Sequence, residues 1–190
     1  MVDGNGRGRP RSESARAAVL HAVDDLLVEV GYAALTMKGI AERAGVGRQT
    51  VYRWWTNKAE VLYEASVLDA QHELAVSRSG DPDQDIRAYL EALVTFLVRS
   101  HAGAAYRALV GEAQHDPDVA LLIASRDILG ESAAEVVDAA CAASGTTLSR
   151  EQATALLIGP PFFRVLAGHA VDGIDTAALA EQFMRTLRAS

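Results

Sequence analysis

The sequence predicts an all-α protein of about nine helices. Apolar residues recur at intervals of three and four in many segments, and no strand-like alternation of apolar and polar residues is sustained anywhere. Residues that end helices, such as Asp116-Pro117 and Ser144-Gly145, separate these segments. With 49% hydrophobic residues, the chain of 190 residues can bury a substantial core in one large or two small domains.

The N-terminal residues 1–13 are expected to form a flexible basic arm, because the stretch VDGNGRGRPRSE is rich in glycine and holds three arginines. A helix is then predicted over residues 14–30, with Gly31 at its end. Its apolar residues lie at i, i+4, i+7, i+8 and i+11, and they are Val19, Val23, Leu26, Leu27 and Val30. These residues are most simply core.

The segment TMKGIAERAGVGRQTVYRWWTNK, residues 36–58, predicts two short helices joined by a tight glycine turn. Thr36 is a good N-cap for a helix over 36–44, and Leu35 and Ile40 can form a hydrophobic staple across it. Gly39 occupies the position where a full capping box has Glu or Gln. Gly45 can take a positive φ and end this helix. The second helix spans 47–53, and Thr56 is expected to cap a third that begins near residue 57.

A short helix braced by a partner across a sharp turn fits the major groove of DNA. The segment therefore favours sequence-specific DNA binding over catalysis. The alternative is a generic small helical core with a charged face. The chain has no metalloprotease HExxH, no P-loop, no nucleophile elbow and no plausible catalytic triad, so a small helical enzyme is a remote alternative.

The spacing of Thr36, Gly45, Tyr52, Trp55 and Lys58 resembles the DNA-binding region of the TetR family of bacterial transcriptional repressors. In that family a Thr or Ser opens the first helix of the motif and a Gly sits at the turn. A Tyr lies late in the recognition helix, an aromatic follows three residues on, and a Lys opens the next helix. The resemblance implies about nine helices, a homodimer, a palindromic double-stranded DNA operator and release of that operator by a small-molecule effector.

The resemblance, checked against side-chain chemistry, assigns roles within the motif. The residues expected to read bases are Lys38, Arg48, Gln49, Thr50 and Arg53, since Arg and Lys suit guanine, Gln suits adenine and the Thr methyl suits thymine. Those expected to contact phosphates are Thr36, Tyr52, Trp54 and Lys58. Trp54 has a packing role as its alternative, and Trp55 is expected to be buried beneath the recognition helix.

In the N-terminal arm, Arg7-Gly8-Arg9-Pro10 resembles an AT-hook core, so Arg7 and Arg9 are candidates for the DNA minor groove. The alternative is a solvated basic tail that adds nonspecific affinity. Residues 1–60 carry nine Lys/Arg and seven Asp/Glu, whereas residues 61–190 carry nine and eighteen. The net charge of −7 is therefore +2 in the first part and −9 in the second. This division supports a DNA-binding domain over 14–60 and a ligand-binding and dimerisation domain over 61–190.

Beyond the motif, a helix is expected over 57–77, and the turn-forming run 78–84 breaks the chain. Further helices are predicted over 85–101, 103–115, 117–144, 149–169 and 175–188. The stretch 156–175 resembles the next-to-last helix of one TetR subgroup, in which Gly-Pro precedes aromatics and an Arg. Pro161 departs from that pattern and should strengthen a kink.

The last two helices are the expected dimer interface, since two such hairpins would form a four-helix bundle. The stripe of the last helix is Ala180, Phe183, Met184 and Leu187, and the stripe before it is Leu156, Gly159, Phe163 and Leu166. The alternative is that these stripes face the protein's own core.

The resemblance implies a small-molecule pocket among the middle helices, and the few aromatics and many Ala, Leu and Val residues suggest a small apolar ligand. Its candidate walls are Tyr89, Leu93, Phe96, Leu97, Tyr106, Leu109, Val110, Leu122, Phe162, Phe163 and Leu166. A C-terminal region that answers a protein partner, or no ligand, stays open as an alternative. Cys141 is the sole cysteine and the histidines are scattered, so neither a metal site nor a cofactor is expected. No apolar leader or membrane span is found, so a cytoplasmic location is expected.

Overall fold

The computed structural model describes residues 9–170 and 173–190, and these ranges form ten helices and no strand. The all-α prediction is confirmed. The helices are α1 (Arg9–Ala34), α2 (Met37–Arg43), α3 (Arg48–Tyr52), α4 (Lys58–Glu73), α5 (Pro82–Arg99), α6 (His101–Glu112), α7 (Pro117–Ala124), α8 (Ile128–Ser144), α9 (Arg150–Leu166) and α10 (Thr176–Ala189). None of the described helices is long and apolar enough to cross a membrane.

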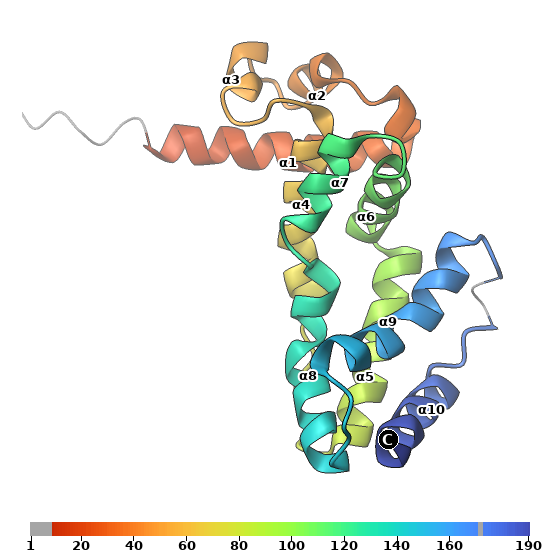
Figure 1. Ribbon diagram of the computed structural model, residues 1–190. Helices are drawn as coiled ribbons and strands as arrows, with labels where there is room; N and C mark the ends of the chain where they lie inside the picture. The colour runs from red at the N-terminus through yellow and green to blue at the C-terminus, as the bar shows by residue number, and fades with distance from the viewer. Residues whose placement is uncertain (1–8, 171–172) are drawn as a thin grey trace, which may run out of the picture.

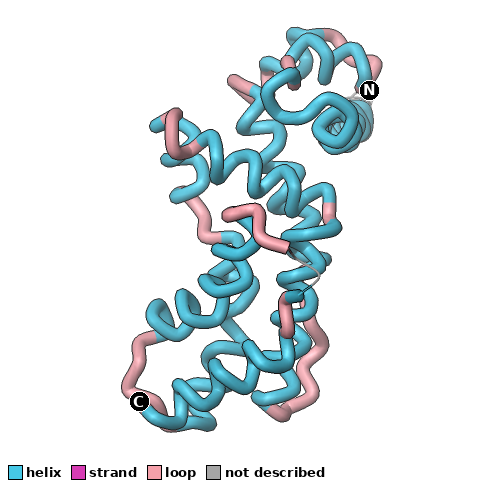
Figure 2. The backbone as a smooth tube through the Cα atoms, turned by 90° about the vertical axis from the view of Figure 1, so that its right-hand side faces the viewer, coloured by secondary structure: helices cyan, strands magenta, loops and turns pink. Residues whose placement is uncertain are grey.

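The molecule is elongated, with α2 and α3 beside α1 at one end and α10 at the other (Figure 1). Helix α4 runs from the first end toward the second and packs against α1 and α6. Short loops join most of the helices (Figure 2). Helix α4 therefore connects the N-terminal helices to the rest of the chain.

Helix α1 is longer than expected at its N-terminal end. It begins at Arg9, so residues 9–13, assigned to the flexible arm, are helical. Pro10 is compatible with this because the first turn of a helix has free N–H positions anyway. Arg7 lies outside the described residues. At the other end, Gly31 has a φ of 74° and interrupts the helical geometry, which agrees with the predicted end at this glycine.

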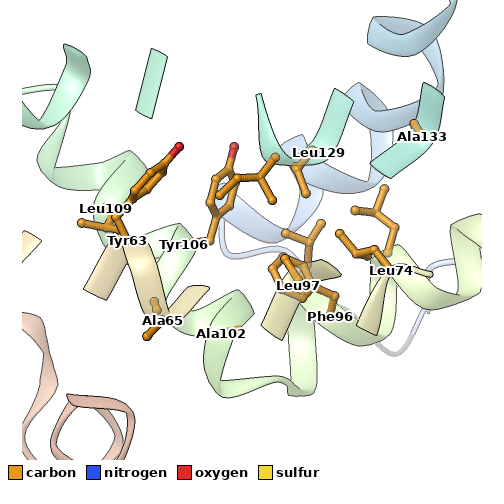
Figure 3. Packing of buried hydrophobic residues seen from close by; sticks show 14 of the residues in the cluster. Tyr63, Ala65, Leu74, Phe96, Leu97, Ala102, Tyr106, Leu109, Leu129 and Ala133 are labelled. Atoms are coloured by element: carbon orange, nitrogen blue, oxygen red, sulfur yellow. The ribbon is translucent and has the colours of Figure 1, made fainter. Parts of the chain in front are cut away.

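The core is built around α5, which packs against α6, α8, α9 and α10. Its buried face repeats every three to four residues and consists of Ile86, Tyr89, Leu90, Leu93, Phe96 and Leu97. Phe96, Leu97, Tyr106 and Leu109 pack with residues of α4 and α8 in the close view of Figure 3. This arrangement fills the centre of the C-terminal region with large side chains.

The single helix predicted over 117–144 is wrong: the chain breaks between Ala124 and Ile128. A new helix, α8, begins after Asp127, because the Asp127 side chain accepts a hydrogen bond from the Gly130 N–H and acts as the N-cap. The Tyr63 hydroxyl on α4 donates to the Arg126 carbonyl at 3.2 Å and holds the joint in place. A similar correction applies to α4, whose N-cap is Asn57 rather than Thr56.

The apolar stripe of the last helix lies in the chain's own core, as the alternative expected, and its role in a dimer interface stays a prediction. Ala180, Phe183, Met184 and Leu187 are all buried within the described chain itself. Helix α10 packs against α5, α8 and α9, and these four residues form its inner face. An amphipathic helix can bury its apolar stripe only once, and here the stripe is used by the chain's own core.

Gly103 on α6 sits against the backbone of α5. A Cβ placed there would lie 1.8 Å from the Phe96 carbonyl oxygen, and backbone cannot move aside as a flexible side chain can. We expect Gly103→Ala to lower the free energy of unfolding by about 3 kcal/mol or more. Gly111→Ala in the same helix is the control, because a Cβ there meets nothing within 4 Å. It should raise stability by up to about 1 kcal/mol in urea unfolding. Equal effects of the two changes would contradict the packing described.

Asp24 on α1 lies where α1 packs on α4 and α6. Its Oδ1 is buried and finds no hydrogen-bond partner among the described residues. Burial, followed by repulsion from Asp69, raises the pKa of Asp24 to about 6. The folded-state pKa exceeds the unfolded value of 3.8, so the folded protein binds this proton more tightly, and the associated stability is lost as the pH rises through 6.

Asp24→Asn cannot ionise and should therefore be more stable than the wild type at pH 8. After allowance for solvent screening we expect a gain of about 1 kcal/mol, shrinking toward pH 4. Urea unfolding across this pH range measures it. Glu135→Gln, at an exposed position on α8 with no ion pair to a described residue, is the control and should show a much smaller gain at pH 8. A gain that does not change with pH would show that repacking, not the charge, is responsible.

Candidate functional site

Helix α2 is fixed by the cap and staple that its sequence predicts. The Thr36 hydroxyl oxygen accepts a hydrogen bond from the Gly39 N–H at 3.0 Å. Leu35 and Ile40 are both buried, as the staple requires. Gly45 takes a φ of 67°, which lets the chain turn sharply after α2.

Helix α3 has five residues and is anchored from below by one of them. Val51 is fully buried, whereas Arg48, Gln49, Tyr52 and, just after the helix, Arg53 are exposed. Tyr52 keeps 56% of its surface accessible. An exposed tyrosine and a row of long polar side chains on a short, anchored helix are available to contact a partner.

Two of the predicted base-reading residues interact within the chain. The Lys38 ammonium lies 3.7 Å from the Glu42 carboxylate one turn along α2, and both side chains are exposed. The Arg53 guanidinium stacks over the Trp54 ring at 4.9 Å. Such exposed contacts are weak and can be exchanged for a phosphate or a base edge. Arg48 makes no ion pair with any described residue and is free to reach outward.

Trp55 is buried beneath α3, as predicted, with 3% of its surface exposed. Its indole N–H donates to Glu64 Oε2 on α4 at 3.0 Å. The other oxygen of Glu64 pairs with Arg16 of α1 at 2.7 Å. Trp54 is half-buried and meets the Trp55 ring edge-on. Glu64 therefore joins α1, α4 and the residues behind α3, a role that the sequence pattern did not reveal.

Lys58 has a partner inside the protein. Its ammonium donates to the Tyr32 carbonyl at 2.7 Å and lies 4.2 Å from the centre of the Tyr32 ring. It thus ties the start of α4 to the end of α1. The ammonium has further N–H groups, so the predicted phosphate contact stays a prediction.

An ion pair that sequence reasoning missed joins α2 to α1. The Arg43 guanidinium binds the Glu29 carboxylate, with one N–O distance of 2.9 Å. The hydrogen bonds from Arg43 hold the pKa of Glu29 below its ordinary value. The two residues lie fourteen positions apart in two different helices, so their contact depends on how the turn between α1 and α2 folds back. Only the tertiary arrangement brings them together.

The C-terminal region contains a hollow of about 660 Å³ between α6, α8 and α9. Its lining residues are Tyr106, Asp127, Leu129, Gly130, Glu131, Ala134, Arg150, Glu151, Thr154, Ala155, Ile158, Gly159 and Phe162. We refer to it as the α8–α9 hollow. A second hollow of about 390 Å³ lies between α4 and α8 and shares Glu131 with the first.

Of the eleven predicted pocket walls, the α8–α9 hollow includes Tyr106 and Phe162. Five others fill the core instead of lining a space, and they are Tyr89, Leu93, Phe96, Leu97 and Leu109. Phe163 and Leu166 are exposed on α9, and Val110 and Leu122 are half-buried away from this hollow. The prediction is corrected because large apolar side chains tend to fill space, and the hollow is lined in good part by small residues.

The arrangement of α2 and α3 defines the class of protein: a helix-turn-helix protein, a class in which the second helix of the motif enters the major groove of DNA. Residues 19–65 match the family model for bacterial regulatory proteins of the tetR family, and residues 76–187 match the tetracyclin repressor-like C-terminal domain. The chain belongs to the TetR family of bacterial transcriptional regulators.

Individual relatives agree with this placement. The chain is 41% identical over 114 residues to the HTH-type transcriptional regulator YdeS of Bacillus subtilis (strain 168), an alignment that spans 60% of this chain and 57% of YdeS. It is 34% identical over 108 residues to the transcriptional activator FasR of Mycolicibacterium smegmatis, spanning 53% of this chain and 48% of FasR. The chain thus spans about half the length of these curated relatives.

Solved structures show the same fold over nearly the whole chain. The TetR family transcription regulator SCO0332 superposes with a TM-score of 0.71 at 26% identity, covering 93% of this chain and 98% of that one. RolR, crystallised with its ligand resorcinol, gives a TM-score of 0.67 at 17% identity, with coverage of 94% and 89%. The latter likeness concerns the fold alone.

Proposed function

We propose that this protein is a homodimeric transcriptional repressor that binds a palindromic operator and releases it when a small molecule binds. The observation that carries the proposal is the short helix α3, with Val51 buried beneath it and Arg48, Gln49 and Tyr52 exposed. Rigid presentation of these side chains is what major-groove recognition requires.

Different residues on and around α3 are proposed to contact the bases and the phosphates. Arg48, Gln49 and Thr50 at the N-terminal end of α3 are the proposed readers of bases, joined by Lys38 and Arg53. Thr36, Tyr52, Trp54 and Lys58 surround α3 and would fix its register through phosphates. Arg9 is the first residue of α1, and Arg7 precedes it in the sequence. We propose that both arginines contact the minor groove.

The dimer interface is proposed on α9. Leu156, Phe163 and Leu166 are exposed large apolar residues on this helix, and Gly159 and Pro160 lie between them. Monomeric proteins rarely leave such a contiguous apolar strip in water. The exposed face of α10, by contrast, carries Glu181, Gln182 and Arg185, which suit the polar rim of an interface. A two-fold dimer presents two α3 helices, hence the palindrome.

The proposed effector site is the α8–α9 hollow, whose volume suits a drug-sized molecule. A molecule there touches Asp127, the neighbour of Arg126, whose carbonyl is held by Tyr63 of α4. Helix α4 also carries Glu64, which binds Trp55 behind α3. A shift of the α7–α8 joint can thus move the DNA-binding end. By linkage, the effector must bind the DNA-free form more tightly than the DNA-bound form.

Binding-site selection from a random duplex library, at one stated and moderate salt concentration, tests the DNA-binding part of the proposal. Enrichment of a palindrome supports a dimeric specific regulator. A reporter gene placed behind the selected site then gives the sign of regulation, which matters because FasR is named an activator. No enrichment from a folded dimer would overturn the proposal.

A further inference from the structure

We infer that the α8–α9 hollow takes an amphipathic cation, an aromatic or aliphatic body that ends in a protonated amine. This inference rests on the proposed effector site and names the chemical class of its ligand. The inner walls suit the apolar body: Leu129, Ala134, Ala155, Ile158 and Phe162 line the hollow. The Phe162 and Tyr106 rings lie 6.2 Å apart at 53° and form an aromatic corner. Aromatic faces also attract cations.

A polar group without a partner points to the position of the head group. Tyr106 has 7% of its surface exposed and lines the hollow, yet its hydroxyl makes no hydrogen bond with any described residue. The hydroxyls of Tyr63 and Tyr89 are satisfied, by the carbonyls of Arg126 and Leu129. In Figure 3 the Tyr63 and Tyr106 hydroxyls point to the same side. The Tyr106 hydroxyl is not one of the fully buried atoms that lack a partner, so it opens to the hollow, where a ligand can reach it.

Tyr106 stays a neutral hydroxyl at physiological pH. Burial, followed by the nearby Asp127 carboxylate, raises the pKa of Tyr106 to about 12. A neutral hydroxyl can accept a hydrogen bond from an ammonium N–H, and the Asp127 carboxylate beside it supplies the charge. Asp127 uses one oxygen to cap α8, which leaves acceptor capacity on the carboxylate.

The charges around the hollow select the sign of the head group. Three carboxylates line it, those of Asp127, Glu131 and Glu151, against one base, Arg150. Arg150 is already bound through two nitrogens to Asp138, one at 2.6 Å. Glu131 is paired with Arg126 at 2.6 Å. Among the described lining residues an anionic head group therefore finds no uncommitted base, whereas an ammonium group meets Asp127 and Glu151.

Three probes with the same biphenylbutyl body test this directly, ending in an ammonium, a hydroxyl or a carboxylate group. Calorimetric titration of the full-length protein at pH 7 and low salt should give the order ammonium, hydroxyl, carboxylate, with at least about tenfold between first and last. Asp127→Asn keeps a good N-cap and removes the charge. Combined with Glu151→Gln, it should weaken the ammonium probe and leave the hydroxyl probe unchanged.

Two further variants make the test sharper. Tyr106→Phe keeps the ring and removes the unpaired hydroxyl, so it should weaken binding of the ammonium probe about tenfold. Asp138→Asn releases Arg150 from its ion pair and should strengthen binding of the carboxylate probe. The circular dichroism of each variant confirms that the helices are retained.

The inference is overturned if the carboxylate probe binds as well as the ammonium probe, if no probe binds, or if the charge-neutral variants leave the order unchanged. Operator affinity, measured in the same samples, distinguishes a failure of the inferred ligand class from a failure of the proposed release of the operator. Selective ammonium binding that leaves the operator complex intact supports the site and its ligand class, and contradicts release by an effector. Loss of the operator complex with all three probes alike supports release and contradicts the head-group selection.

Discussion

Replacing Arg48 by alanine is expected to reduce affinity for the selected operator by about 30-fold or more, since each half-site loses about 1–3 kcal/mol and a dimer has two of them. Arg48 is exposed at the start of α3 and makes no ion pair with a described residue, so its removal leaves no buried group unsatisfied. The variant should unfold at the same urea concentration as the wild type.

The pattern of the loss identifies the kind of contact. A base reader relaxes specificity at one base pair of each half-site, whereas a phosphate contact from an uncharged side chain such as Tyr52 weakens all sequences alike and leaves the salt slope unchanged. Arg48→Ala should show the first behaviour and Tyr52→Ala the second, in fluorescence anisotropy with single-base operator variants. Arg87→Ala, an exposed arginine on α5, is the control and should bind normally. If both Arg48→Ala and Tyr52→Ala bind the operator as tightly as the wild type, the assigned contacts are wrong.

Phe163→Asp is expected to convert the dimer into monomers and to weaken operator binding by about 100-fold, because the two half-sites are then no longer engaged together. Phe163 keeps 67% of its surface exposed in the single chain, so the change should not destabilise the fold. Sedimentation at micromolar protein concentration measures the state of association. Leu121→Asp places the same charge at another exposed apolar position, on α7, and should leave the dimer intact.

Phe183 provides the opposite comparison. It is 4% exposed on the inner face of α10, so Phe183→Ala should lower the free energy of unfolding by about 3–5 kcal/mol through the cavity it leaves. A stable Phe183→Ala monomer, together with a Phe163→Asp dimer, would place the interface on α10 and refute the proposal for α9.

The helix-turn-helix was predictable because its signals are local. The cap at Thr36, the positive φ at Gly45 and the staple of Leu35 with Ile40 each act within a few residues, and the structure has all three. Local signals do not tell which of the apolar stripes on α9 and α10 faces the core and which faces solvent. Both have helical spacing, and which stripe faces the core depends on how α5, α8, α9 and α10 come together.

The hollow was largely missed for a different physical reason. Large apolar residues attract attention in a sequence, but in a close-packed interior they fill space. The hollow forms where small residues such as Gly130, Ala134 and Ala155 leave room, beside charged residues from the ends of α8 and α9. Small residues are common in this chain, and their spacing alone does not tell a hollow from a close helix contact.

The adjacency of Trp54 and Trp55 gives this protein a built-in optical sensor. The chain has two tryptophans, and both directly follow α3: Trp55 is buried and bound to Glu64, and Trp54 is half-buried under Arg53. The α8–α9 hollow is lined by no tryptophan. Tryptophan fluorescence therefore reports on the DNA-binding end alone. A change in the emission spectrum when a ligand binds in the α8–α9 hollow would mean that the conformational change has reached the DNA-binding end. Unlabelled protein is enough to time that transmission in a stopped-flow experiment.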